Sequence, residues 1–139
     1  FCSGYLTEQG FRHPIYFAAA MHNPDNLDTS ANSLMIQEDP GSHNNFNVGA
    51  GPAARIWRYD LASETLSVVA AVDQSADTTG ARLGAWESSG ILNVSDAFGP
   101  GAWLVTVQAH TLFVETEQRG PLLFKREGGQ LVLLRVPGS

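Results

Sequence analysis

Apolar residues occur along this chain in short runs, most of them alternating with polar residues or rich in β-branched and aromatic side chains. Gly, Pro, Asn, Asp or Ser bound each run, which is typical of strands joined by turns. The pattern predicts strands over residues 14–19, 33–37, 54–60, 66–72, 90–94, 102–108, 121–124 and 130–136. Little of the 139-residue chain is left for helix, so the sequence predicts an all-β domain.

The order of the predicted strands repeats weakly. The order strand, loop, strand, turn, strand in residues 33–72 returns about fifty residues later, in residues 86–136. A period of roughly 40 to 50 residues with four antiparallel strands per unit is that of a β-propeller blade. We therefore expect one β domain with an N-terminal strand segment (1–22), a first blade-like unit (23–84) and a last blade-like unit (85–139). Closed propellers have about 4 to 8 blades. Two blade-like units are too few to close a ring, so we expect an incomplete ring in one chain.

Charge and cysteine content narrow the classes of function. Asp and Glu number 14 against 8 Lys and Arg, and the net charge of −6 without a basic cluster argues against nucleic-acid binding. No apolar run reaches the roughly 18 to 20 residues of a membrane span. The single cysteine, Cys2, excludes an intrachain disulfide and a multi-cysteine metal site. It is either a small buried hydrophobe or a thiolate bound to a transition metal.

Acidic and amide side chains gather at the ends of predicted strands, in residues 23–28, 37–39 and 86–90. Such oxygen-rich groups suit Ca²⁺, although the same residue types are ordinary turn formers. No DxDxDG loop is present, so a calcium site would be assembled from different strands. His110 ends an apolar strand, where it could bind a metal, hold a phosphate oxygen or cap the sheet. Metal-assisted hydrolysis fits these residues better than a nucleophile-and-base triad, because no GxSxG motif is present.

Four motifs, in order, resemble one family. They are DNLDTSANSLMIQEDPGSHN, RIWRYDLASETLSVVA, WESSGILNVSDAFGPGAWLVTVQAH and EGGQLVLLRVP, within residues 25–137. Together they look like the C-terminal blades of PhoX-like alkaline phosphatases, which are bacterial β-propellers, and the opening FCSGYL resembles the start of the same proteins. The resemblance implies a secreted or periplasmic protein with a central calcium site, in some members together with iron, that hydrolyses phosphate monoesters.

The positions of the motifs also imply site residues. Carried over in this way, the metal ligands are Glu38, Glu87, Cys2 and Asp25. The residues expected next to the ligands or the substrate are Asn26, Asp39 and His110.

The chain departs from the family between Met21 and Asp25, where the large middle section is missing. Residues 18–22 (AAAMH) stand in place of an acidic pair. Three interpretations stay open: a fragment, a miniature that completes its ring by homo-oligomerisation, or blades kept as a structural module. Two functions follow, a metal-dependent phosphomonoester hydrolase or a non-catalytic, secreted, self-assembling β module. A carbohydrate or small-ligand site would rest only on three tryptophans, which in such strands are more often core: Trp57, Trp86 and Trp103.

Overall fold

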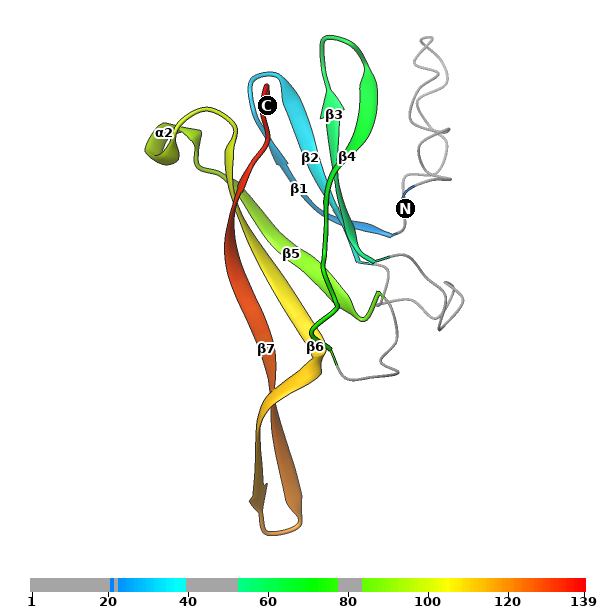
Figure 1. Ribbon diagram of the computed structural model, residues 1–139, viewed down its shortest axis with the longest axis vertical. Helices are drawn as coiled ribbons and strands as arrows, with labels where there is room; N and C mark the ends of the chain where they lie inside the picture. The colour runs from blue at the N-terminus through cyan, green and yellow to red at the C-terminus, as the bar shows by residue number, and fades with distance from the viewer. Residues whose placement is uncertain (1–20, 22, 40–52, 78–83) are drawn as a thin grey trace.

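The computed structural model describes residues 21, 23–39, 53–77 and 84–139, which form two antiparallel sheets (Figure 1). The first sheet has four strands in the order β1-β2-β3-β4, and the second has three in the order β5-β6-β7. The strands are β1 (Pro24–Thr29), β2 (Ser33–Glu38), β3 (Arg55–Asp60), β4 (Thr65–Ala71), β5 (Trp86–Asn93), β6 (Ala102–Arg119) and β7 (Leu122–Arg135). A one-turn helix, α2 (Ser95–Phe98), connects β5 to β6.

Polar side chains shape the turns of the first sheet. Between β1 and β2, the Ser30 hydroxyl accepts a hydrogen bond from the Ser33 amide at 3.1 Å. Between β3 and β4, the Asp60 carboxylate accepts the amides of Ala62 and Ser63 at 3.1 and 2.9 Å. These side chains satisfy amides that leave the strand ladder, so the chain can reverse within a few residues.

The second sheet is dominated by the hairpin of β6 and β7. Its strands are joined by Gly120 and Pro121, and Gly120 has a φ of 58°. A glycine at the first of two turn residues, followed by proline, suits a type II′ hairpin turn. The pairing is irregular between Ala109 and Glu115, and beyond that point the hairpin projects away from both sheets (Figure 1).

The hydrophobic core lies between the two sheets. Met35 and Ile56 of the first sheet pack in one cluster with Trp103, Val105 and Val136 from the second sheet and the residue after it. Trp103 and Met35 have no exposed surface. Burial of these large side chains supplies the main driving force that holds the sheets together.

All three tryptophans are buried, with 0 to 7% of their surface exposed, and therefore belong to the core: Trp57, Trp86 and Trp103. No helix in the described part of the chain is long and apolar enough to cross a membrane.

The prediction of an all-β fold is confirmed, and β2, β3 and β4 lie within a residue of their predicted bounds. The prediction of a four-stranded second unit is wrong. Segments 121–124 and 130–136 belong to one strand, because Gly128 and Gly129 stay extended and pair with β6 instead of forming a turn. The described residues form two sheets without ring closure. The strand predicted at 14–19 lies outside the described residues.

Candidate metal centre

Three strand ends meet where the first sheet approaches the second. Pro24 at the start of β1 pairs with Glu38 at the end of β2, and a bulge between Pro24 and Asn26 displaces Asp25 from the regular register. The Asp39 amide donates to the carbonyl of Asn23 at 3.0 Å, and the Asn23 side chain donates to the Asp39 carbonyl at 2.9 Å. These bonds fix the backbone of Asp39 beside the start of β1.

Asp25, Asp39 and Glu87, hereafter the acidic group, bring one carboxylate oxygen each to within 4.8 Å of one another. Glu87 is the second residue of β5, so the acidic group joins the two sheets. Asp25 is exposed, whereas Asp39 and Glu87 keep only 9% and 8% of their surface in contact with solvent. Three carboxylates at such distances repel one another unless a proton or a cation compensates their charge.

Burial and the charge repulsion within the acidic group are expressed in the pKa of Glu87. Its burial and its hydrogen bond with Asp39 raise the pKa of Glu87 to about 7, although His110 acts in the opposite direction. A carboxyl group with this pKa exchanges its proton near neutral pH. A divalent cation would compete with that proton, because ligand carboxylates bind metals in their ionised form.

His110 lies between two carboxylates. Its Nε2 is 3.3 Å from Glu87 Oε1, and its Nδ1 is 2.8 Å from Glu127 Oε2. Burial disfavours the protonated ring, but the hydrogen bonds to Glu127 and Glu87 outweigh it and raise the pKa of His110 above its ordinary value. Protonated at both nitrogens, His110 places a positive charge beside the acidic group, from the neighbouring strand β6.

Glu38 lies outside the acidic group. Its fully buried carboxylate accepts hydrogen bonds from Arg55 Nη2 at 2.7 Å, from Arg55 Nε at 2.9 Å and from Trp57 Nε1 at 2.9 Å. The backbone amide of Arg55 adds a fourth, at 3.0 Å. Glu38 is the last residue of β2 and contacts Arg55 and Trp57 of the neighbouring strand β3, whereas Asp39, which follows β2, joins the acidic group.

Some of the other predicted site residues lie in or next to the acidic group, and one cannot be placed. Asp25, Asp39 and Glu87 come together in the acidic group, and His110 contacts Glu87. Asn26 donates from Nδ2 to Asp25 Oδ2 at 3.2 Å and so contacts one member of the acidic group. Cys2 lies outside the described residues. The link from His110 to Glu127 had no clear signal in the sequence, because the EGGQ stretch reads as a turn and is in fact part of β7.

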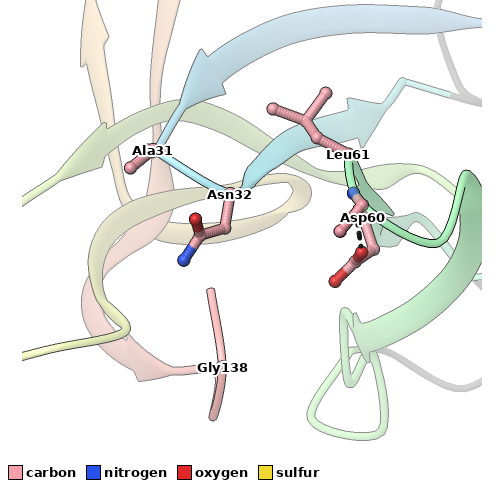
Figure 2. Close-up of a pocket in the computed structure, with 6 residues that line it drawn as sticks. Ala31, Asn32, Asp60, Leu61 and Gly138 are labelled. Atoms are coloured by element: carbon pink, nitrogen blue, oxygen red, sulfur yellow. Dashed lines mark hydrogen bonds between the residues drawn. The ribbon is translucent and has the colours of Figure 1, made fainter.

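A separate cavity of about 450 Å³ lies at the turns of the first sheet (Figure 2). It is lined by Ala31, Asn32, Asp60, Leu61, Ala62 and Gly138. Hydrogen bonds from the backbone and side chain of Ser63 hold the pKa of Asp60 below its ordinary value, and Arg58 contributes in the same direction. Asp60 is thus committed to its own turn, and no member of the acidic group lines this cavity.

Comparisons with protein-family models, with curated proteins and with solved structures gave no significant match to this chain.

Proposed function

We propose that the acidic group binds Ca²⁺ and forms part of a centre for phosphomonoester hydrolysis, in a secreted or periplasmic relative of the PhoX-like phosphatases. The observation that carries the proposal is the convergence of Asp25, Asp39 and Glu87 within 4.8 Å. The family resemblance of the surrounding motifs supplies the reaction class. Both point to the same residues, because Asp25 and Glu87 belong to the motifs that resemble that family.

The donor chemistry of the acidic group fits a hard cation. Ca²⁺ takes about 6 to 8 oxygen ligands, so three carboxylates would supply part of the set and leave positions for water or substrate oxygens. Bound Ca²⁺ would polarise a phosphoryl oxygen or activate water. His110 lies 3.3 Å from Glu87, where its protonated ring would favour an anionic phosphate ester. Iron, in contrast, is supported only by the resemblance.

We also propose that the two sheets are propeller-like blades. The first sheet has the sequential meander order of a blade. Strand register places Leu27, Ile36, Trp57 and Val68 in one row across the first sheet. It also places Leu92, Leu104 and Leu133 in one row across the second sheet. Leu27 and Val68 at the ends of the first row, and Leu92 and Leu133 at the ends of the second, are exposed, whereas Trp57 within the first row is buried. The ends of both rows therefore offer apolar surface to further layers.

These rows favour a second candidate, a non-catalytic module that assembles with other copies or with the remainder of a longer propeller. The two functions differ in their chemistry. The hydrolase requires cation binding and turnover of a phosphate monoester, whereas the assembly module requires neither.

The test is calorimetric titration with Ca²⁺, paired with hydrolysis of an aryl phosphate monoester. We expect Asp39→Asn and Glu87→Gln each to lower Ca²⁺ affinity at least about tenfold, since each removes a charged ligand. Asp96→Asn, which removes an exposed carboxylate of α2, is the matched control and should bind like the native chain. Calcium binding without hydrolysis would favour the assembly module. Native chain that binds no Ca²⁺ would refute the proposed site.

A further inference from the structure

The distal half of the β6–β7 hairpin is a two-stranded ribbon. This arm comprises residues 113–127, in which Phe113 pairs with Glu127 and Arg119 pairs with Leu122. It projects beyond both sheets (Figure 1). Its exposed large apolar residues are Phe113, Val114, Leu122, Leu123 and Phe124. Isolated two-stranded ribbons are marginally stable in water, and stable sheets need at least about three strands with a covered apolar face.

Within residues 21, 23–39, 53–77 and 84–139, one long edge of β7 has no neighbouring strand. Among the described strands β7 pairs with β6 alone, over 14 residues. Protected edge strands are short or carry inward charges, proline or bulges. Here two apolar segments, 122–124 and 131–134, flank the polar block 125–130 at nearly equal distances. An antiparallel copy of such a strand presents its apolar segments to those of the original.

We propose that β7 pairs antiparallel with β7 of a second copy of this chain, about a two-fold axis at Gly128. A two-fold axis between identical antiparallel strands sets one residue opposite itself. With Gly128 on the axis, the residue pairs are Leu122 with Leu134, Leu123 with Leu133, Phe124 with Val132 and Lys125 with Leu131.

Neighbouring registers are worse. With Glu127 on the axis, two glutamates lie directly opposite each other, which destabilises a strand pair. With Gly129 on the axis, Lys125, Arg126 and Glu127 all face apolar residues of the other copy. The Gly128 register instead sets Glu127 opposite Gly129 and Arg126 opposite Gln130. It is the register that matches the apolar segments and sets no like charges directly opposite each other.

The available area suits a dimer of moderate affinity. Six apolar residues of this edge are 37 to 66% exposed: Leu122, Leu123, Phe124, Leu131, Val132 and Leu133. At about 100 Å² each their exposed surface amounts to on the order of 600 Å² per copy, which is the upper limit of the apolar area that strand pairing covers and is below the about 800 Å² per partner of a standard interface. The backbone ladder adds to this area. The arm of each copy would lie against the second sheet of the other, so each arm would gain the strands that it lacks.

The first test uses charge at position 131, which the register sets opposite Lys125 of the second copy. By sedimentation velocity we expect a native dimer with a dissociation constant in roughly the micromolar range. Leu131→Glu loses apolar contact but gains an attractive pair, whereas Leu131→Lys meets a like charge at both ends of the interface. The dissociation constant of the Leu131→Lys dimer should therefore be about fivefold to tenfold higher than that of the Leu131→Glu dimer. Leu61→Lys, an exposed substitution in the turn after β3, is the matched control and should leave the dimer unchanged.

The second test reads the register directly. In a Cys2→Ser background, Leu123→Cys combined with Leu133→Cys should give a covalent dimer on mild oxidation, because opposite Cβ atoms of a strand pair lie within disulfide reach. Phe124→Cys combined with Leu133→Cys is shifted by one residue and should not cross-link. The proposal is overturned by a native chain that stays monomeric up to about 1 mM, by equal dissociation of the two Leu131 variants, or by equal cross-linking of both cysteine pairs. No member of the acidic group lies on β7, so a chain that fails to dimerise would still leave the proposed Ca²⁺ site to be judged by its own titration.

Discussion

Replacing Glu38 separates a structural role of this residue from a role as metal ligand. Its carboxylate is fully buried and accepts four hydrogen bonds, three from Arg55 and one from Trp57. In Glu38→Gln the shape is retained, but the charge is lost and an amide NH₂ faces N–H donors. The Arg55 guanidinium, whose side chain is 22% exposed, then loses the carboxylate to which its Nε and Nη2 donate.

The expected loss follows from that geometry. Breaking a buried ion pair by removing one partner costs about 3 to 5 kcal/mol, and here the removed charge is the fully buried one, with 0% of the Glu38 side chain exposed. Hydrogen bonds to charged groups contribute about 1.5 to 3 kcal/mol each, but their contributions do not add independently. We therefore expect Glu38→Gln to lower the free energy of unfolding by about 3 to 5 kcal/mol. At a urea m-value of about 2 kcal/mol per molar, the unfolding midpoint should fall by roughly 2 M. Calcium affinity should change little, because Glu38 is not in the acidic group.

Urea unfolding followed by tryptophan fluorescence, together with calcium calorimetry, measures both quantities on one preparation. Glu117→Gln is the control, since Glu117 forms an exposed ion pair with Arg119 and its loss should cost less than about 1 kcal/mol. The prediction is refuted if Glu38→Gln has the same urea midpoint of unfolding as the native chain. It also fails if the variant loses Ca²⁺ binding at unchanged stability, which would restore Glu38 as a ligand.

Two further predictions concern pH and backbone strain. Without Ca²⁺, stability should fall as pH rises from about 5 to 8, because folded Glu87 has a pKa of about 7 against 4.5 for the ordinary group and so holds a proton that the unfolded chain releases. The raised pKa of His110 acts in the same direction above its ordinary value of 6.5. Thermal melts in the presence of a chelator should show this decline in stability, and Glu87→Gln should flatten it. A melting temperature that rises between about pH 5 and 8 would contradict the prediction. Gly101→Ala should lower the unfolding free energy by about 2 to 3 kcal/mol, because Gly101 has a φ of 73° and a Cβ there would collide with the Val136 carbonyl. Gly120→Ala, at a φ of 58° with open space around it, should lose only about 1 kcal/mol in the same urea titration, and equal losses would show that the collision is relieved.

A strand could be predicted from the sequence only where its own residues carry the pattern of a strand. Alternating apolar residues specify β3, and its predicted start and end are correct within a residue. Strand β1 has the sequence PDNLDT and no such alternation. It is extended because it pairs with β2 and because Asp28 accepts the Asn93 amide of β5 at 2.6 Å. Such a strand depends on partners that are distant in sequence, which a local pattern does not reveal.

The candidate site shows the same limit at the level of single residues. Motif resemblance singled out the region that contains Asp25, Asp39 and Glu87, and the structure brings these three together. It named Glu38 as a ligand and its neighbour Asp39 as a residue beside the ligands, whereas Asp39 is in the acidic group and Glu38 lies outside it. That choice depends on which face of β2 meets Arg55 and on the bulge at Asp25, and both are set by pairing between strands. Residue type therefore predicted the chemistry of the site, whereas strand register decided its members.

The position of the acidic group connects cation binding to the packing of the sheets. Asp25 and Asp39 belong to the first sheet and Glu87 to the second, so repulsion among them acts across the junction. At the other end of β1 the junction is held by the bond from Asn93 to Asp28, and the core cluster lies between the sheets. A proton on Glu87 relieves the repulsion at low pH, and a bound cation would relieve it above pH 7. We therefore expect Ca²⁺ to stabilise the junction most strongly where the proton is lost, which couples the proposed site to the stability of the fold.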